Sequence, residues 1–153
     1  MKNLKTGLVL VLVAALVFGV IGVAIAGGTA EAQSGPQYND GTYYAQSELD
    51  GRMRQGVLEI TIMDGEIIGA HYDEIERNED GEIVMHKLGN HAYAENWRGA
   101  RDYDTSQFSA FPAYVNQLVA GGSPDEVDLV TGATSSYETL IELAEEVLAR
   151  ASR

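Results

Sequence analysis

The sequence predicts an α+β domain in which helices pack on one face of an antiparallel sheet. Apolar residues alternate with polar ones in the first half of the chain and recur at helical spacing in the second half. A run of strands followed by a run of helices is typical of the α+β class. The 153 residues allow one such domain preceded by a hydrophobic leader helix.

Four Asp-Gly pairs divide the first half, at residues 40–41, 50–51, 64–65 and 80–81. Asp-Gly between alternating segments is a strong hairpin signal. The alternating apolar residues of two central strands are Leu58, Ile60 and Ile62, then Ile68, Ala70 and Tyr72. With flanking strands at Thr42–Ser47 and Glu82–His86, these segments predict a meander with one face that needs a cover.

Helical spacing predicts three helices in the second half: Asn90–Arg98, Gln107–Ala120 and about Ser136–Ala149. Gly121-Gly122 should end the second helix, and Pro112 should fall in its first turn, where a missing N–H costs least. A short strand is expected at Val127–Val130. The apolar face of the third helix is formed by Leu140, Ile141, Ala144, Val147 and Leu148.

The first 32 residues have the composition of a signal peptide or a signal anchor. Lys2 and Lys5 precede a stretch without charge from Thr6 to Ala30, which is longer than the ~7–15 residues of a typical signal-peptide core. Small residues at 24–26 and 30–32 form two possible cleavage sites. The basic head keeps the amino end in the cytoplasm, so the domain is expected outside, either single-pass in the cell membrane or secreted if the leader is cleaved.

Residues 33–39 are expected to form a polar linker, and residues 40–153 the domain. The formal charge of the chain is −13; the leader contributes +1, which leaves −14 for the rest. A surface this acidic argues against nucleic-acid binding. It suits solubility outside the cell, and it also suits steering toward a cationic redox partner. Without cysteine the chain forms no disulfide, haem attachment or iron–sulfur cluster.

The most informative stretch is Asp128–Ser136, with the sequence DLVTGATSS, just before the third helix. Ser135 and Glu138 have the spacing of a capping box, which predicts a helix start at about Ser136. Thr134 would then present its hydroxyl where unpaired N–H groups and the positive end of the helix dipole converge. Such a position suits a phosphate ester, and Gly132 and Ala133 leave the approach open.

This stretch resembles the flavinylation motif of the FMN-binding domain family, Asp-x-x-Ser/Thr-Gly-Ala-Thr-x-Ser/Thr. That family includes the C subunit of the sodium-pumping quinone reductase and small extracellular electron-transfer flavoproteins. The resemblance continues upstream, through DGTYYAQS at 40–47, DGEIIGAHYDEI at 64–75, Tyr93 with Trp97, and FPAYVNQLV at 111–119. It covers nearly all of the chain after residue 38.

The resemblance implies that a flavin transferase with a metal ion moves FMN from FAD onto Thr134 and joins the FMN phosphate to the threonine oxygen. Asp128 would belong to the determinant that the transferase reads. Thr131 and Ser136 would shape the turn or receive the transferase, and Thr131 is the main competitor for the link. The expected cofactor-binding residues are Thr134, Asp128, Thr131, Gly132, Ala133, Ser135 and Ser136.

Trp97 and Tyr114 are the aromatic residues most favoured to stack on the isoalloxazine ring, although ordinary core packing is the commoner role of such residues. Tyr93, Phe108 and Phe111 are further candidates. The histidines His71, His86 and His91 lack the compact spacing of metal ligands, so no metal site is expected. No nucleophile–base pair or phosphate-binding loop is present in the sequence, so no catalytic residue is expected.

The sequence therefore predicts an extracytoplasmic electron carrier rather than an enzyme. Its expected partners are the flavin transferase, a membrane electron donor, an extracellular acceptor, and the membrane itself through the N-terminal segment. Three alternatives remain at this point: a subunit of a larger membrane redox complex, a module that works with a separate reductase, and a non-redox surface binding domain that has lost the flavin.

Overall fold

The computed structural model describes residues 37–101 and 104–152. The predicted leader and most of the predicted linker lie outside these ranges. Tyr38, which the sequence placed in the linker, is buried against the core. The elements are β1 (Gly41–Gln46), β2 (Arg54–Met63), β3 (Glu66–Arg77), β4 (Ile83–His86), α1 (His91–Arg101), α2 (Gln107–Gly121), the short 3-10 helix η1 (Pro124–Glu126) and α3 (Thr134–Ala151).

The four strands form one antiparallel sheet in the order β1-β2-β3-β4, so the predicted meander and the α+β class are confirmed. The tight turn between β2 and β3 is made by Asp64 and Gly65, whose φ angles are both positive at 55° and 79°. A two-residue turn of this hand matches the twist of the strands it joins. The third Asp-Gly pair thus forms the hairpin that the sequence predicted.

The other three Asp-Gly pairs do not form two-residue hairpin turns of this kind. Asp50 begins the turn between β1 and β2, and its carboxylate accepts hydrogen bonds from the N–H groups of Arg52 and Arg54 at 2.8 and 2.9 Å. Residues 80–81 lie in the β3–β4 connection. The hairpin prediction is wrong for the first pair: residues 40–41 lead directly into β1, and the Asp40 carboxylate accepts from Gly65 N–H at 3.0 Å.

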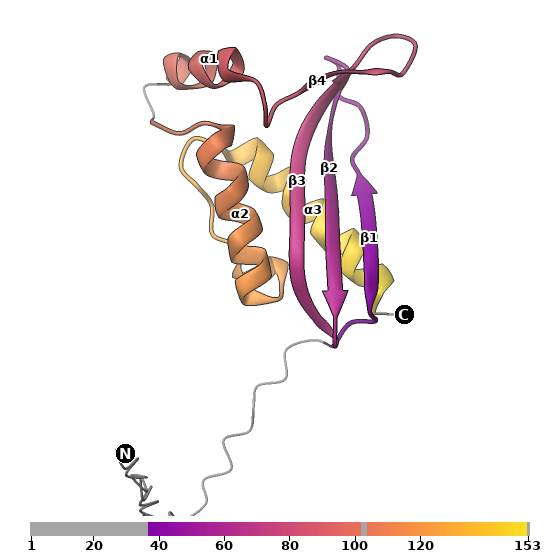
Figure 1. Ribbon diagram of the computed structural model, residues 1–153. Coiled ribbons are helices and arrows are strands. Elements are labelled where there is room, and N and C mark those ends of the chain that lie inside the picture. The colour runs from indigo at the N-terminus through magenta and orange to yellow at the C-terminus, as the bar shows by residue number, and fades with distance from the viewer. Residues whose placement is uncertain (1–36, 102–103, 153) are drawn as a thin grey trace, which may run out of the picture. The chain divides into compact units, whose positions relative to one another are not determined.

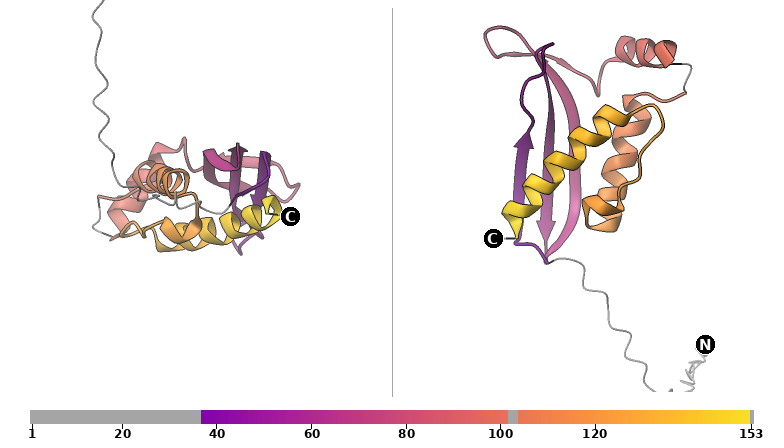
Figure 2. Two further views of the ribbon diagram at one scale, coloured as in Figure 1. Left: turned by 90° about the horizontal axis from the view of Figure 1, so that it is seen from below. Right: turned by 180° about the vertical axis from the view of Figure 1, so that it is seen from behind.

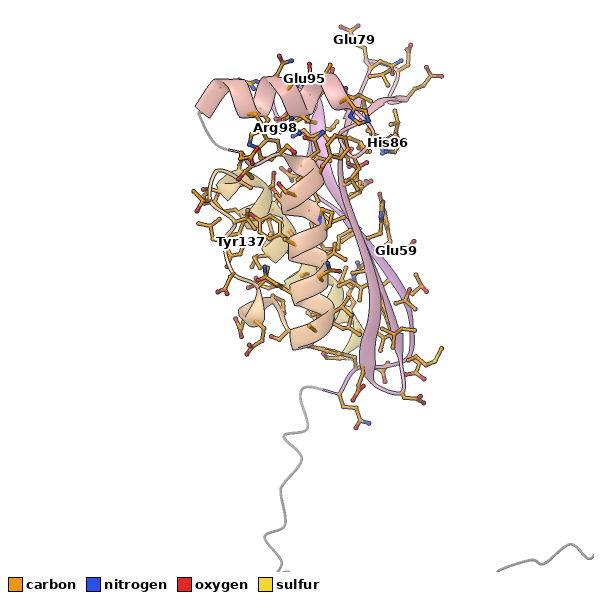
Figure 3. All side chains as sticks on the ribbon, turned by 60° about the vertical axis from the view of Figure 1, so that its left-hand side comes forward. Glu59, Glu79, His86, Glu95, Arg98 and Tyr137 are labelled. Carbon is orange, nitrogen blue, oxygen red and sulfur yellow. The ribbon has the colours of Figure 1, made fainter. Side chains whose placement is uncertain are left out.

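Two helices cover one face of the sheet. Helix α3 crosses β1 and β2, and α2 lies along β3, as Figure 1 and Figure 2 show. The core between them contains the predicted inward residues Leu58, Ile60, Ile62 and Tyr72, together with Phe111, Leu118, Leu140, Leu143, Ala144 and Val147 from the helices. The predicted alternation is wrong at Ile68, which is 51% exposed, because a register shift opposite Thr61 and Ile62 places Ile67 in the core instead. On the open face, Glu59 and His86 project away from the helices (Figure 3).

Helix α2 begins at Gln107, because Ser106 is its N-cap and the Ser109 hydroxyl accepts the Ser106 N–H at 3.1 Å. Pro112 therefore lies in the second turn, and the prediction of a first-turn proline is wrong. The proline leaves the Phe108 carbonyl without the usual helical hydrogen bond. Gly122 ends the helix in the left-handed region with φ 70°, as the predicted stop requires.

The predicted start of α3 is also wrong. The helix begins at Thr134, two residues early, because the Tyr137 N–H already bonds to the Ala133 carbonyl at 3.0 Å. Ser135 and Glu138 lie inside the helix and form no capping box. The strand expected at Val127–Val130 is instead an extended connection without a sheet partner, in which the Asp128 N–H bonds to the Gln117 side chain.

Helix α3 packs tightly against the sheet at Gly56. A Cβ atom at Gly56 would lie 2.4 Å from Cγ2 of Thr139. We therefore expect Gly56→Ala to lower the free energy of unfolding by about 2 kcal/mol through overpacking, measured by chemical denaturation. Thr139→Ser removes Cγ2 and is the matched background. There the glycine substitution should cost clearly less, and an equal cost in both backgrounds would contradict this packing.

Candidate functional site

The turn that precedes α3 is held through three consecutive carbonyl oxygens. The Thr105 hydroxyl donates to Thr131 O at 2.9 Å, the Trp97 indole N–H donates to Gly132 O at 3.1 Å, and the Tyr114 hydroxyl donates to Ala133 O at 3.1 Å. These donors come from the segment before α2, from α1 and from α2 itself. The turn is therefore fixed by parts of the chain that are distant in sequence.

This fixation exposes the start of α3. The carbonyl and the N–H of one trans peptide point in opposite directions. The Ala133 carbonyl accepts the Tyr137 N–H at 3.0 Å as well as the Tyr114 hydroxyl, so it points along the axis of α3, and the Thr134 N–H points out of the start of the helix. The N–H groups of Thr134, Ser135 and Ser136 belong to the first turn and have no carbonyl of α3 to bond. The Thr134 side chain is exposed beside them.

A pocket of about 820 Å³ adjoins the turn. Helix α1 forms one wall with Tyr93 and Trp97, and the turn and α3 form another with Gly132, Ser135 and Ser136. The β1–β2 turn closes a third side. Its lining is polar and aromatic, and it lies beside a helix start, so we consider it as the candidate ligand site.

The floor of the pocket is the polar end of the β2–β3 hairpin. Along β2 the residues on the helix-covered face change from Ile62, Ile60 and Leu58 to Gly56 and then Arg54. On β3 the partners of Leu58, Gly56 and Arg54 are Tyr72, Glu74 and Glu76. One hairpin thus supplies the apolar core at one end and a charged floor at the other.

Two ion pairs occupy this floor around the Tyr93 ring. The Lys87 ammonium lies 4.8 Å from the ring centroid and pairs with Glu74, while the Arg54 guanidinium carbon lies 5.8 Å from the centroid and Arg54 Nε pairs with Glu76 at 3.0 Å. Cations this close to an aromatic ring are attracted to its face. Lys87 is 6% exposed and is the only lysine after the leader.

Tyr72 connects the floor to α3. Its hydroxyl lies 3.1 Å from Glu74 Oε1 and 3.2 Å from the Ser136 carbonyl, so its single proton is shared between two acceptors. Burial, and then the neighbouring Glu74 carboxylate, raise the pKa of the Tyr72 phenol well above its usual value. The phenol therefore stays protonated and holds the first turn of α3 against the sheet.

The structure brings together part of the predicted site. Gly132, Ser135, Ser136 and Trp97 line the pocket, and Thr134 lies between two of them in sequence. Ala133 is buried as the N-cap. Asp128 and Thr131 are exposed but line no part of the pocket, so they are free for other contacts at the surface.

Tyr114 does not fit the role that the sequence assigned to it. Its side chain is fully buried, and its hydroxyl donates to Ala133 O and accepts from Val130 N–H. A ring without an exposed face cannot stack on a bound ligand, so Tyr114 supports the turn instead. Trp97 and Tyr93 are the aromatic residues that face the pocket, and their rings meet edge to face at 5.9 Å.

Sequence reasoning missed Thr105, Lys87 and Arg54 as residues of this site. The sequence did offer a signal for Lys87, because a single lysine among so many acidic residues is expected to form an ion pair. Thr105 carried no such signal, since its contact with Thr131 spans 26 residues.

Residues 37–101 and 104–152 contain no cluster of three or more side chains able to hold a metal ion. Within the same ranges, no helix combines the length and hydropathy needed to span a bilayer.

Comparison with known proteins identifies one informative relative. The crystal structure of the CPE2226 protein from Clostridium perfringens matches with a TM-score of 0.64 and 30% sequence identity, over 74% of this chain and 88% of that chain. The chain belongs to the same family as CPE2226. The description of that structure names no activity, ligand or partner. Membership of the family therefore supports the fold, and any inference about function must come from the residues of the site.

A second solved structure, determined by solution NMR for a protein from Clostridium thermocellum, covers 74% of this chain and 92% of that chain. It is 18% identical with a TM-score of 0.47, and we base no conclusion on it. No protein-family model matches the chain, and no curated protein matches it.

The contact of Tyr114 with the turn is testable by stability. Tyr114→Phe keeps the ring but removes the donor to Ala133 O, a buried contact, and the acceptor of the part-buried Val130 N–H, so we expect a loss of about 2 kcal/mol in the free energy of unfolding. The matched control is Tyr44→Phe, whose hydroxyl is exposed, with an expected change below about 0.5 kcal/mol. Equal effects in the two variants would show that the turn does not depend on Tyr114.

The Tyr72 phenol makes stability depend on alkaline pH. Because its pKa is higher in the folded chain than in the unfolded one, the stabilisation is complete below about pH 10 and is lost as the pH rises beyond it. The free energy of unfolding should fall more steeply with pH in the wild type than in Tyr72→Phe, by up to ~1.4 kcal/mol per pH unit. Denaturation curves at several alkaline pH values give the free energy of unfolding as a function of pH for each protein. Equal slopes in the two proteins would contradict this role of Tyr72.

Proposed function

We propose that this protein is an extracytoplasmic electron-transfer protein that carries FMN through a phosphoester bond to Thr134. The observation that carries the proposal is the position of Thr134. Its side chain is exposed on the first residue of α3, within the stretch that resembles the flavinylation motif, and beside a pocket large enough for a flat ring.

The residues of the site fit FMN on three counts. The pocket volume of about 820 Å³ lies within the ~300–1,000 Å³ usual for cofactor sites. Tyr93 and Trp97 offer aromatic surface, and the polar floor suits the polar edge of an amphipathic ring. The unpaired N–H groups of Thr134, Ser135 and Ser136 suit a phosphate group.

The bound flavin would supply the redox chemistry, and the protein would supply attachment, position and electrostatics. The start of α3 would stabilise the remaining negative charge of the phosphodiester by ~0.3–1 kcal/mol. Covalent attachment has a clear advantage outside the cell, where a dissociated cofactor is not easily replaced. In this domain a covalent bond would also retain an anionic nucleotide despite its electrostatic repulsion by a chain whose charge after the leader is −14.

The partners that follow from this proposal are a flavin transferase with its metal ion, FAD as the FMN donor, a membrane electron donor and an extracellular acceptor. Asp128 and Thr131 are exposed and remain available to the transferase. The domain would turn over no substrate by itself. A place as a subunit of a larger membrane redox complex remains compatible with the same site, as does tethering or secretion through the leader.

The test is co-expression of the full chain with a flavin transferase, followed by denaturing electrophoresis and detection of flavin fluorescence. The wild-type band should fluoresce, because a phosphoester survives denaturation. Thr134→Ala should abolish the signal. Thr42→Ala is the matched control: it removes an exposed hydroxyl on β1, outside the motif, and should leave the band fluorescent. Thr131→Ala is made alongside, because Thr131 is the competing attachment position.

A dark wild-type band beside an active transferase would reject the proposal and favour a non-redox surface domain of the same fold. A fluorescent Thr134→Ala band together with a dark Thr131→Ala band would move the attachment to Thr131. Intact-mass measurement of each variant distinguishes one attached FMN from adsorbed flavin.

A further inference from the structure

Trp97 belongs both to the pocket and to the turn. Its ring lines the pocket, and its indole N–H donates to the Gly132 carbonyl at 3.1 Å. Thr105 holds the preceding carbonyl, that of Thr131, at 2.9 Å. The two contacts thus act on adjacent peptide groups immediately before Thr134.

We propose that Trp97 and Thr105 are positioning residues for the attachment of FMN to Thr134. This inference rests on the function proposed above. Neither side chain needs to touch the reacting atoms. They act through the carbonyl oxygens of Gly132 and Thr131, which set the direction in which the following residues leave the turn.

Gly132 is where such control is needed. Its φ of 87° lies in the left-handed region, which glycine enters at little cost and also leaves at little cost. A peptide group next to glycine therefore has more alternative orientations than its neighbours. The Trp97 hydrogen bond selects one of them, and Ala133 and Thr134 follow from that orientation into α3.

The indole is itself held in place. The Trp97 ring meets the ring of Phe111, a fully buried residue of α2, at a centroid distance of 6.3 Å. At the other end of α1, the His91 ring lies 4.9 Å from Phe108 of α2. These ring contacts fix α1, and with it the indole N–H donor, relative to α2 and the core. A positioning contact requires a donor that is fixed in this way.

The step that these residues would serve is a phosphoryl-group transfer. The Thr134 hydroxyl oxygen forms a bond to the FMN phosphorus of FAD, the pyrophosphate P–O bond breaks, and AMP leaves. The threonine proton is released, and the product is a phosphodiester with one negative charge. Because the attacking oxygen must approach in line with the departing AMP, a displacement of Thr134 by about 1 Å can slow the step up to a hundredfold.

The experiment measures attachment to the full chain by a purified flavin transferase with FAD, as a function of acceptor-protein concentration. Trp97→Phe keeps an aromatic ring but removes the N–H donor. We expect kcat for attachment to fall roughly tenfold or more, with KM changed less than about twofold, since Asp128 and the exposed residues of the motif are unaltered. Tyr44→Phe is the matched control, because Tyr44 is exposed on β1 and lines no part of the pocket, and it should leave both constants unchanged.

Thr105→Val is the second variant and decides the matter if Trp97→Phe does not fold. It removes the hydrogen bond to Thr131 O and should also lower kcat at constant KM. Wild-type rates in both folded variants would overturn this inference alone, whereas no labelling of the wild type would overturn the proposed function with it. A fall in kcat that follows the loss of thermal stability across the variants, and that also occurs in Tyr44→Phe, would show that the two residues only support the structure.

Discussion

The three hydrogen bonds to the carbonyl oxygens of Thr131, Gly132 and Ala133 are the constraint on which the site depends. They close the turn early, so that α3 begins at Thr134 rather than two residues later. The N–H groups of the first turn have no carbonyl of α3 to bond, and they lie next to the exposed Thr134 side chain. Without the three bonds, no contact with α1, α2 or Thr105 would fix the conformation of the turn.

The pocket exists because the β2–β3 hairpin extends beyond the part of the sheet that α2 and α3 cover. Helices α2 and α3 bury the apolar part of the β2–β3 hairpin, and beyond Gly56 the same face continues as Arg54, Glu74 and Glu76. Buried ion pairs are poor sources of stability, because desolvation offsets much of their attraction. The largely buried Lys87–Glu74 pair and the partly exposed Arg54–Glu76 pair therefore make the floor polar rather than strengthen the fold, and helix α1 forms the opposite wall of the pocket.

Local sequence patterns predicted the fold well. The details of the site were harder to predict because they depend on contacts between residues that are distant in sequence. The alternation around Leu58 and Ile60, and the turn at residues 64–65, gave the central hairpin, because period and turn chemistry are local properties. The start of α3 was misplaced because the carbonyl partners Trp97 and Tyr114 lie 35 and 19 residues away. The same distance hid the structural role of Tyr114, which composition alone made a stacking candidate.

The most direct test of the central claim uses the protein purified from its own host. Trypsin should release a peptide that ends at Arg150 and contains the whole turn, since no lysine or arginine lies between Arg101 and Arg150. The account predicts that this peptide carries the mass of FMN less one water, and that fragmentation places the addition on Thr134. An unmodified peptide, or an addition on another residue, would contradict it.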